Sequence, residues 1–259
     1  MIIVASDVHL GSQNSNKQDF MRFLDLCNSP AVDQLILLGD ILDFWRRNNA
    51  SVVVENSDVL EKIGQMKPGK VQYIVGNHDY YILRLSKRYA NDYFHFPVSR
   101  SLRLTDGDSQ FYFTHGYELE VLANLEPVSI ENYESFCDRM CFSEDVLGEY
   151  ASNLWNWYEN RKGAWWKLKV IKSGPQIRED MNRIKALAQA KGKYLLLGMH
   201  PGEKLIFGHT HDPFISGDGM VANCGSWFNE YKKSSHRNTY VIIDNGKMEV
   251  KTFDENNFP

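Results

Sequence analysis

The sequence predicts an α/β protein in which two mixed β-sheets pack against each other, with helices outside them. Short apolar or β-branched runs are each followed at once by glycine, serine or threonine and a polar cluster, which is typical of buried strands. Segments with helical spacing of apolar residues separate the first three runs. Two later runs are joined by Asn245-Gly246, a strong signal for a tight antiparallel hairpin.

The expected elements follow one another as a β-α-β-α-β start and a more antiparallel end. Helices are expected at 17–26 and 52–66, between the first three strands. The expected strands are 2–5, 35–38, 71–75, 111–113, 204–207, 220–224, 239–244 and 247–253. Because the carboxyl ends of such strands converge on one edge of the sheet, we expect the functional residues there.

The segment 118–193 differs from the rest, because strand signals vanish and helix formers are mixed with aromatic residues. It predicts a helical insertion within a single domain that spans residues 1–259. Ser173-Gly174-Pro175 interrupts this insertion, and an amphipathic helix follows at 176–191 until Gly192 stops it. With 43% hydrophobic residues, the chain can form one large core rather than two equal domains.

Composition narrows the class of protein. The formal net charge of -4 argues against obligate binding to bulk nucleic acid. The four cysteines include no C-x-x-C pair, so we expect free thiols. The first residues show no signal peptide, and no apolar run is long enough to span a bilayer. We therefore expect a cytoplasmic protein, which could contact a membrane surface peripherally through the insertion.

Seven potential metal ligands occur in the polar clusters that follow the expected strands. They are Asp7, His9, Asp40, Asn77, His115, His209 and His211. A carboxylate can bridge two cations about 3.5–4 Å apart, and Asp40 is the candidate bridge. Asp7 and His9 are two residues apart, so both can turn inward only on a loop that leaves the strand. The pair His209 and His211 has the same requirement.

These residues form five motifs along the chain. They are Asp7-Val8-His9, Gly39-Asp40-Ile41-Leu42-Asp43, Gly76-Asn77-His78-Asp79, Thr114-His115-Gly116 and Gly208-His209-Thr210-His211. The sequence thereby resembles the calcineurin-like metallophosphoesterase superfamily, whose motifs are D-x-H, G-D-x-x-D, G-N-H-D/E, a lone His and G-H-x-H. One motif alone means nothing, but five in order are very specific. The resemblance implies that superfamily's four-layer α/β/β/α fold.

The resemblance also implies a site with two divalent metal ions. One metal would take Asp7, His9, Asp40 and His211, and the other would take Asp40, Asn77, His115 and His209. A hydroxide that bridges the metals would attack phosphorus in line with the leaving group. His78 would stabilise the transition state or protonate the leaving oxygen, while Asp43 holds its imidazole. Mixed carboxylate, imidazole and amide donors favour manganese, with iron or zinc as alternatives.

Further residues have two interpretations each. Trp45, Arg46 and Arg47 directly follow the Asp43 motif and could contact substrate, or the arginines could simply be exposed. Trp165 and Trp166 lie in the insertion among basic residues. They could pack the insertion beside a solvated basic face, or form a substrate lid that receives an acyl chain or a base. Asp79 could be structural or catalytic.

Within the superfamily the chain most resembles the UDP-2,3-diacylglucosamine pyrophosphatase group. The shared features are Ser-Asp-Val-His-Leu, the run from Gly39 to Trp45, and a helical insertion before the last histidine pair. The chain departs from the best-known branch at His78, where that branch has arginine. We therefore expect a phosphoesterase that cleaves a phosphodiester or pyrophosphate bond, with a nucleotide-sugar lipid as one candidate substrate.

Two other functions stay open from the sequence. One is a DNA nuclease of the Mre11/SbcD kind, although those enzymes typically carry histidine where this chain has Asp43 and are longer. The other is a non-catalytic protein-binding scaffold, which would fit a chain that had lost its ligands. All seven candidate ligands are present here. The metal content of the purified protein would separate the scaffold from the enzymes.

Overall fold

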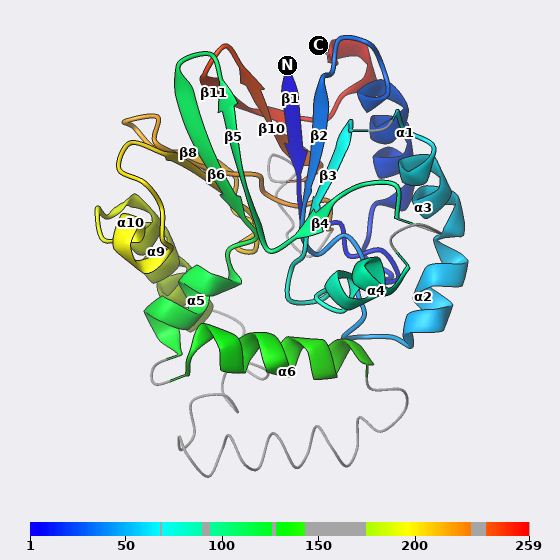
Figure 1. Ribbon diagram of the computed structural model, residues 1–259, viewed down its shortest axis with the longest axis horizontal. Coiled ribbons are helices and arrows are strands. Elements are labelled where there is room, and N and C mark those ends of the chain that lie inside the picture. Colours follow the sequence, from blue (N-terminus) through cyan, green and yellow to red (C-terminus); the bar gives the residue numbers. More distant parts are fainter. Residues whose placement is uncertain (68, 90–93, 126–127, 143–174, 229–236, 259) are drawn as a thin grey trace.

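The computed structural model describes residues 1–67, 69–89, 94–125, 128–142, 175–228 and 237–258. Its strands form two sheets, so the predicted α/β class is confirmed (Figure 1). The first sheet has the order β11-β10-β1-β2-β3-β4, with β1 at Ile2–Ala5, β2 at Gln34–Leu38, β3 at Val71–Ile74, β4 at Val98–Ser99, β10 at Thr239–Asp244 and β11 at Lys247–Thr252. The second has the order β5-β6-β7-β9-β8, with β5 at Ser101–Asp106, β6 at Ser109–Thr114, β7 at Lys204–Phe207, β8 at Phe214–Ile215 and β9 at Val221–Asn223.

Both sheets are mixed, as the sequence predicts. Strands β1 to β4 pair in parallel, and β10 is antiparallel to both β1 and β11. In the second sheet β6, β7 and β9 are parallel, and β5 and β8 are antiparallel edges. Asn245 and Gly246 both have positive φ, at 49° and 76°, which a tight hairpin turn between β10 and β11 requires.

Alternating side chains along the strands fill the space between the sheets. Ile2 and Val4 of β1 point into this space, where they meet Phe111 and Phe113 of β6 and Ile206 of β7. The intervening residues of β1 point to the opposite face of the first sheet. Because both faces of the sheets are covered at their centres, central strands such as β1 and β2 are apolar along nearly their whole length.

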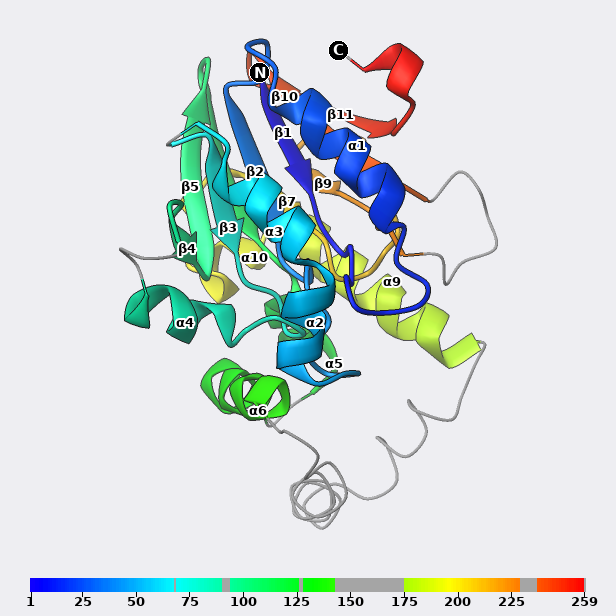
Figure 2. The same ribbon diagram turned by 90° about the vertical axis from the view of Figure 1, so that its right-hand side faces the viewer.

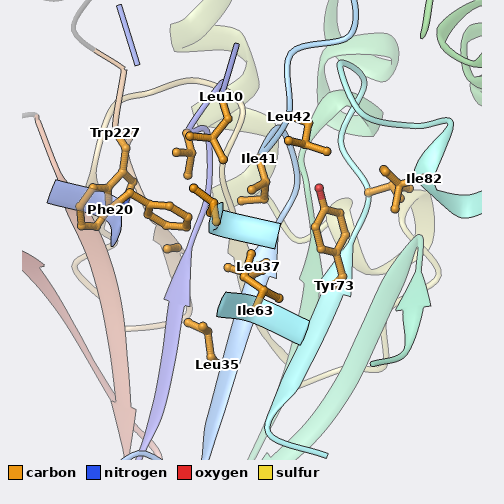
Figure 3. Close-up of a cluster of buried hydrophobic side chains, with 14 of the residues drawn as sticks. Leu10, Phe20, Leu35, Leu37, Ile41, Leu42, Ile63, Tyr73, Ile82 and Trp227 are labelled. Carbon is orange, nitrogen blue, oxygen red and sulfur yellow. The ribbon is translucent and has the colours of Figure 1, made fainter. Parts of the chain in front are cut away.

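Helices cover the outer faces of the two sheets. On the first sheet, Phe20 of α1 (Lys17–Cys27) and Ile63 of α3 (Ser57–Gly64) pack against Leu35 and Leu37 of β2 (Figure 3). On the second sheet, α5 (Tyr117–Asn124) and α9 (Pro175–Gln189) cover β6 and β7, and Ile184 is one of the buried contacts. The four layers are therefore helix, sheet, sheet and helix.

The segment 52–66 differs from the single helix expected there. The structure has α2 (Asn49–Glu55) and α3, separated at Asn56. The side-chain amide of Asn56 donates to the carbonyl of Val52 at 2.7 Å, and its φ of -119° is not helical. A side chain that competes for backbone hydrogen bonds interrupts a helix in this way.

The end of the first sheet where β1 to β3 finish carries several helices. Figures 1 and 2 show α4 (Ile82–Arg88), α5 and α6 (Ile130–Phe142) at this end. Within the expected insertion, the described part contains α5, α6 and α9, and α10 (Lys193–Leu196) begins at its last residue. A short 3-10 helix at Glu255–Asn257 closes the chain. In the described ranges, no helix has both the length and the apolar character needed to cross a membrane.

Candidate metal centre

The loops that leave β1, β2 and β7 have an unusual backbone. Among the described residues other than glycine, seven have positive φ. Five of them are candidate ligands with φ between 51° and 64°, namely Asp7, His9, Asp40, His209 and His211. Each costs about 1–3 kcal/mol, and such strain persists where the surrounding structure enforces it. Because β1 ends at Ala5 and β7 at Phe207, both D-x-H and H-x-H pairs lie on loops, as expected.

Two glycines let these loops come close together. Gly39 has a φ of +82°, and a Cβ atom there would lie 2.5 Å from His115 Nδ1. A Cβ atom on Gly208 would lie 2.5 Å from Asp7 Oδ2. Any larger residue would push the loops apart. This steric constraint explains why glycine precedes Asp40 and His209.

Three candidate ligands from the two ends of the chain form one group. The ligand atoms of Asp7, His9 and His211 lie within 4.8 Å of one another. His211 Nε2 is 3.2 Å from Asp7 Oδ1, and His9 Nε2 is 3.4 Å from His211 Nε2. Asp7 Oδ2 accepts from the backbone N–H of His209 at 2.9 Å, so this oxygen holds the second loop while Oδ1 faces the group.

A second group forms beside the first. The ligand atoms of Asp40, His115 and His209 also lie within 4.8 Å of one another. Asp40 Oδ2 is 3.3 Å from His115 Nε2 and 3.8 Å from His9 Nε2, so this carboxylate lies between the two groups. The structure thus brings six of the seven candidates together, and the seventh, Asn77, is buried in the adjoining loop.

Buried polar atoms of this centre test whether metal ions fit it. Within the described part of the chain, Asp7 Oδ1, Asn77 Oδ1 and His115 Nε2 are buried and make no well-aligned hydrogen bond. A buried polar atom that makes no hydrogen bond costs about 1–3 kcal/mol. All three are good ligand atoms for divalent metals, so bound cations would satisfy them. The donor set therefore fits a metal centre.

The electrostatics of the centre favour a cation. Burial lowers the pKa of His115, but the charges of Asp40 and Asp7 outweigh burial and raise this pKa to about 10. A proton and a metal ion compete for the same lone pair, so the potential that retains the proton also attracts a divalent ion. His115 Nδ1 is 2.8 Å from the carbonyl oxygen of Leu38, which would leave Nε2 for a metal ion.

His78 lies at the edge of the centre and is held from behind. Its Nδ1 is 2.9 Å from Asp43 Oδ1, and its backbone N–H donates to Asp40 Oδ1 at 2.8 Å. Burial lowers the pKa of His78, but the charge of Asp40 and the hydrogen bond to Asp43 raise it above its usual range. Bound cations would oppose this rise. Nδ1 therefore faces Asp43, and Nε2 is the other nitrogen of the ring.

The residues after Asp43 surround this histidine. The ring of Trp45 stacks on the imidazole of His78, with centroids 4.4 Å apart. Arg46 donates to Asp43 Oδ2 at 2.9 Å. Arg47 instead forms an ion pair with Glu55, in which both terminal nitrogens lie 2.5 Å from a carboxylate oxygen. Substrate contacts by these three residues stay predictions, as do those by Trp165 and Trp166, which lie outside the described residues.

Asp79 binds the loops of the centre to each other. Its carboxylate accepts from the backbone N–H groups of Ile41 at 2.8 Å and Gly76 at 2.7 Å, and from the Tyr73 hydroxyl at 2.6 Å. Burial and the charge of Asp40 raise its pKa to about 6. Of the two interpretations from the sequence, these contacts favour the structural one.

Replacing Asp79 by alanine should lower the free energy of unfolding by about 3 kcal/mol or more, because three buried donors lose their acceptor at about 1–3 kcal/mol each. Tyr73→Phe removes one donor of the three and should cost only about 1 kcal/mol. Urea unfolding of both variants measures the difference. Equal losses would contradict the role given to the Asp79 carboxylate.

Sequence reasoning missed several residues of the site. Glu120 places Oε2 2.7 Å from His209 Nε2. Phe228 contacts the rings of His9 and His211 at centroid distances of 5.1 Å and 6.2 Å. Cys141 donates its thiol to the carbonyl of His78 at 3.2 Å. None of these three residues belongs to a motif. The only sequence feature that could have indicated one of them is that Glu120 lies five residues after His115.

The fold and the site together define a class of protein, an α/β sandwich with a candidate two-metal centre at the carboxyl ends of its strands. The chain belongs to the calcineurin-like phosphoesterase family, whose sequence model matches residues 1–213. This family uses a dinuclear metal centre, and the candidate groups described above are where such ions fit. A search of curated proteins finds no match.

Several solved structures are similar to this chain. One is Yfce, a phosphoesterase from E. coli, with 18% identity, a TM-score of 0.47, and coverage of 97% of this chain and 92% of that chain. Another is a dimetal phosphatase from Danio rerio, with 14% identity, a TM-score of 0.48, and coverage of 96% and 94%. A third is Vps29 from Chaetomium thermophilum, with 14% identity, a TM-score of 0.38, and coverage of 96% and 94%.

Proposed function

We propose that this protein is a dinuclear metal-dependent phosphoesterase that hydrolyses a phosphodiester or pyrophosphate bond. The observation that carries the proposal is the position of Asp40, whose carboxylate lies 3.3 Å from His115 in one group and 3.8 Å from His9 in the other. Two cations bound there would activate water as the nucleophile and neutralise charge on the phosphate.

Each residue of the centre has a proposed role. Asp7, His9 and His211 hold the first ion, and Asn77, His115 and His209 hold the second, with Asp40 shared by both. This division follows the two groups of ligand atoms. Asn77 is assigned to the second group because it precedes His78, whose backbone N–H donates a hydrogen bond to Asp40. Manganese is the proposed ion, because the donors are oxygen and imidazole nitrogen without thiolate.

His78 is the proposed catalytic residue outside the metal ligands. With Nδ1 on Asp43, the ring presents Nε2 to the substrate and can give a proton to the leaving oxygen or stabilise the transition state. Trp45 fixes the ring plane by stacking. Arg46 has half-exposed side-chain atoms beside Asp43 and is the proposed contact for a second, non-scissile phosphate.

The proposed substrate class is a nucleotide sugar that carries acyl chains. One support is the sequence likeness to the UDP-2,3-diacylglucosamine pyrophosphatase group. The other is that the insertion packs against the loop that carries Asn77 and His78. Cys141 of α6 contacts the carbonyls of His78 at 3.2 Å and Asn77 at 3.6 Å. The insertion, proposed as a cap within one domain, would receive the acyl part and could contact a membrane surface.

A substrate panel tests this function. With Mn²⁺ present, we expect hydrolysis of bis-p-nitrophenyl phosphate and of an acylated UDP-sugar, and loss of both activities after chelation. The panel includes p-nitrophenyl phosphate, UDP-sugars without acyl chains, and single-stranded and duplex DNA. Selective cleavage of DNA would replace the proposed substrate by the nuclease alternative. Inactivity on every substrate with two bound ions would contradict an enzymatic role on these bonds.

A further inference from the structure

Glu120 makes a contact with the metal centre that its position in the sequence does not predict. It lies on α5, the first helix of the insertion, and its side chain is about one-tenth exposed. Its Oε2 atom is 2.7 Å from His209 Nε2. His209 itself lies after β7, so this contact joins the insertion to the last ligand loop.

We infer that Glu120 is a positioning residue that orients His209, so that His209 binds the second metal ion through Nδ1. This inference rests on the proposed two-metal site. An imidazole that donates one N–H to a carboxylate has a fixed tautomer and ring orientation, and the other nitrogen gains basicity. Since Nε2 faces the Glu120 carboxylate, Nδ1 is the nitrogen that would bind the ion.

Two other histidines of the site are held in the same manner. His115 has Nδ1 at 2.8 Å from the Leu38 carbonyl oxygen, and His78 has Nδ1 at 2.9 Å from the Asp43 carboxylate. In both rings Nδ1 faces an acceptor of the protein. His209 differs in that its outer acceptor is a carboxylate from the insertion. The second ion is thereby coupled to the placement of α5.

The helix that carries Glu120 is itself firmly placed. Glu118, two residues earlier, accepts from the Gly116 N–H at 3.1 Å and from the Thr114 hydroxyl at 2.5 Å. Val121 and Leu119 of α5 are buried in two different apolar clusters. Glu120 can therefore hold the His209 ring because its own backbone is fixed from both sides.

Metal binding tests this inference without reference to turnover. The full-length protein is dialysed against a series of Mn²⁺ concentrations, and bound Mn²⁺ per chain gives one Kd for each ion. In Glu120→Ala we expect the second ion to bind about 10–100-fold more weakly, as losses of outer carboxylates typically do. The first ion should keep its Kd. Glu120→Gln retains a neutral acceptor for the imidazole N–H and should lie between the alanine variant and the wild type.

Glu134→Ala is the matched control. Glu134 is also a buried carboxylate in the insertion, but it accepts from Tyr117 at 2.8 Å and pairs with Arg100 at 3.0 Å, away from the candidate ligands. It should leave both Kd values unchanged. Equal weakening in Glu134→Ala and Glu120→Ala would overturn the inference, because general loosening of the insertion would explain both. A Glu120→Gln variant as weak as Glu120→Ala would also overturn it, in favour of direct ligation by Glu120.

Failure of the inference differs from failure of the proposed function. Two ions in the wild type with unchanged Kd values in Glu120→Ala would overturn the role of Glu120 alone. A wild-type protein that binds fewer than two ions would overturn the two-metal site and, with it, this inference.

Discussion

Asp40→Ala is expected to lose both metal ions and all measurable hydrolysis together. The Asp40 carboxylate lies between the two groups of candidate ligands, so its removal takes one ligand and one negative charge from each ion. Metal affinity should fall by more than the factor of about 10–100 that follows removal of a hydrogen-bond partner of a metal ligand. Metal content after desalting and the rate of bis-p-nitrophenyl phosphate hydrolysis are the two measurements.

A second substitution separates metal loss from misfolding. Asp40→Asn keeps an acceptor for the backbone N–H of His78, which now bonds to Asp40 Oδ1 at 2.8 Å, but removes the charge. It should fold like the wild type and still lose both ions. In the control Glu203→Ala, a buried carboxylate outside the centre loses its bonds with Arg103 and His200, so stability should fall while both ions remain. An Asp40→Asn protein with two ions and full activity would contradict the bridging role.

The strands could be predicted from the sequence because they are buried on both faces. Runs such as those of β1, β7 and β10 are apolar except at some of their end residues, and their bounds in the structure agree with the prediction. The edge strand β5 was missed. Its residues Leu102 and Leu104 are only partly buried and alternate with polar ones, so a short half-buried edge gives a weak signal.

The candidate ligands could be predicted because motif residues and strand ends coincide. The sequence indicated that Asp7 and His9 must lie on a loop. It did not predict that these two residues and Asp40 have positive φ angles. Glu120 and Phe228 reach the site through tertiary packing, which no local pattern encodes. The sequence therefore predicts the candidate ligands at the strand ends better than it predicts the residues that contact and orient them.

His78→Ala should retain both metal ions and lose about 10²–10⁴-fold in turnover, the range typical of a general acid or base. The metals should remain because the contact of His78 with Asp40 is made by its backbone N–H, which the substitution keeps. The turnover should fall because Nε2 of an imidazole held by Asp43 and Trp45 is lost. His200→Ala is the control, since the His200 side chain is 69% exposed.

The size of the loss should depend on the leaving group, which decides between the two roles proposed for His78. A p-nitrophenolate leaves without protonation, whereas an alkoxide needs a proton in the transition state. If His78 is the general acid, His78→Ala should lose far more activity on an alkyl phosphodiester than on bis-p-nitrophenyl phosphate. Equal losses on both would favour electrostatic stabilisation of the transition state. Loss of metal in parallel with activity would instead make His78 a ligand or a structural residue.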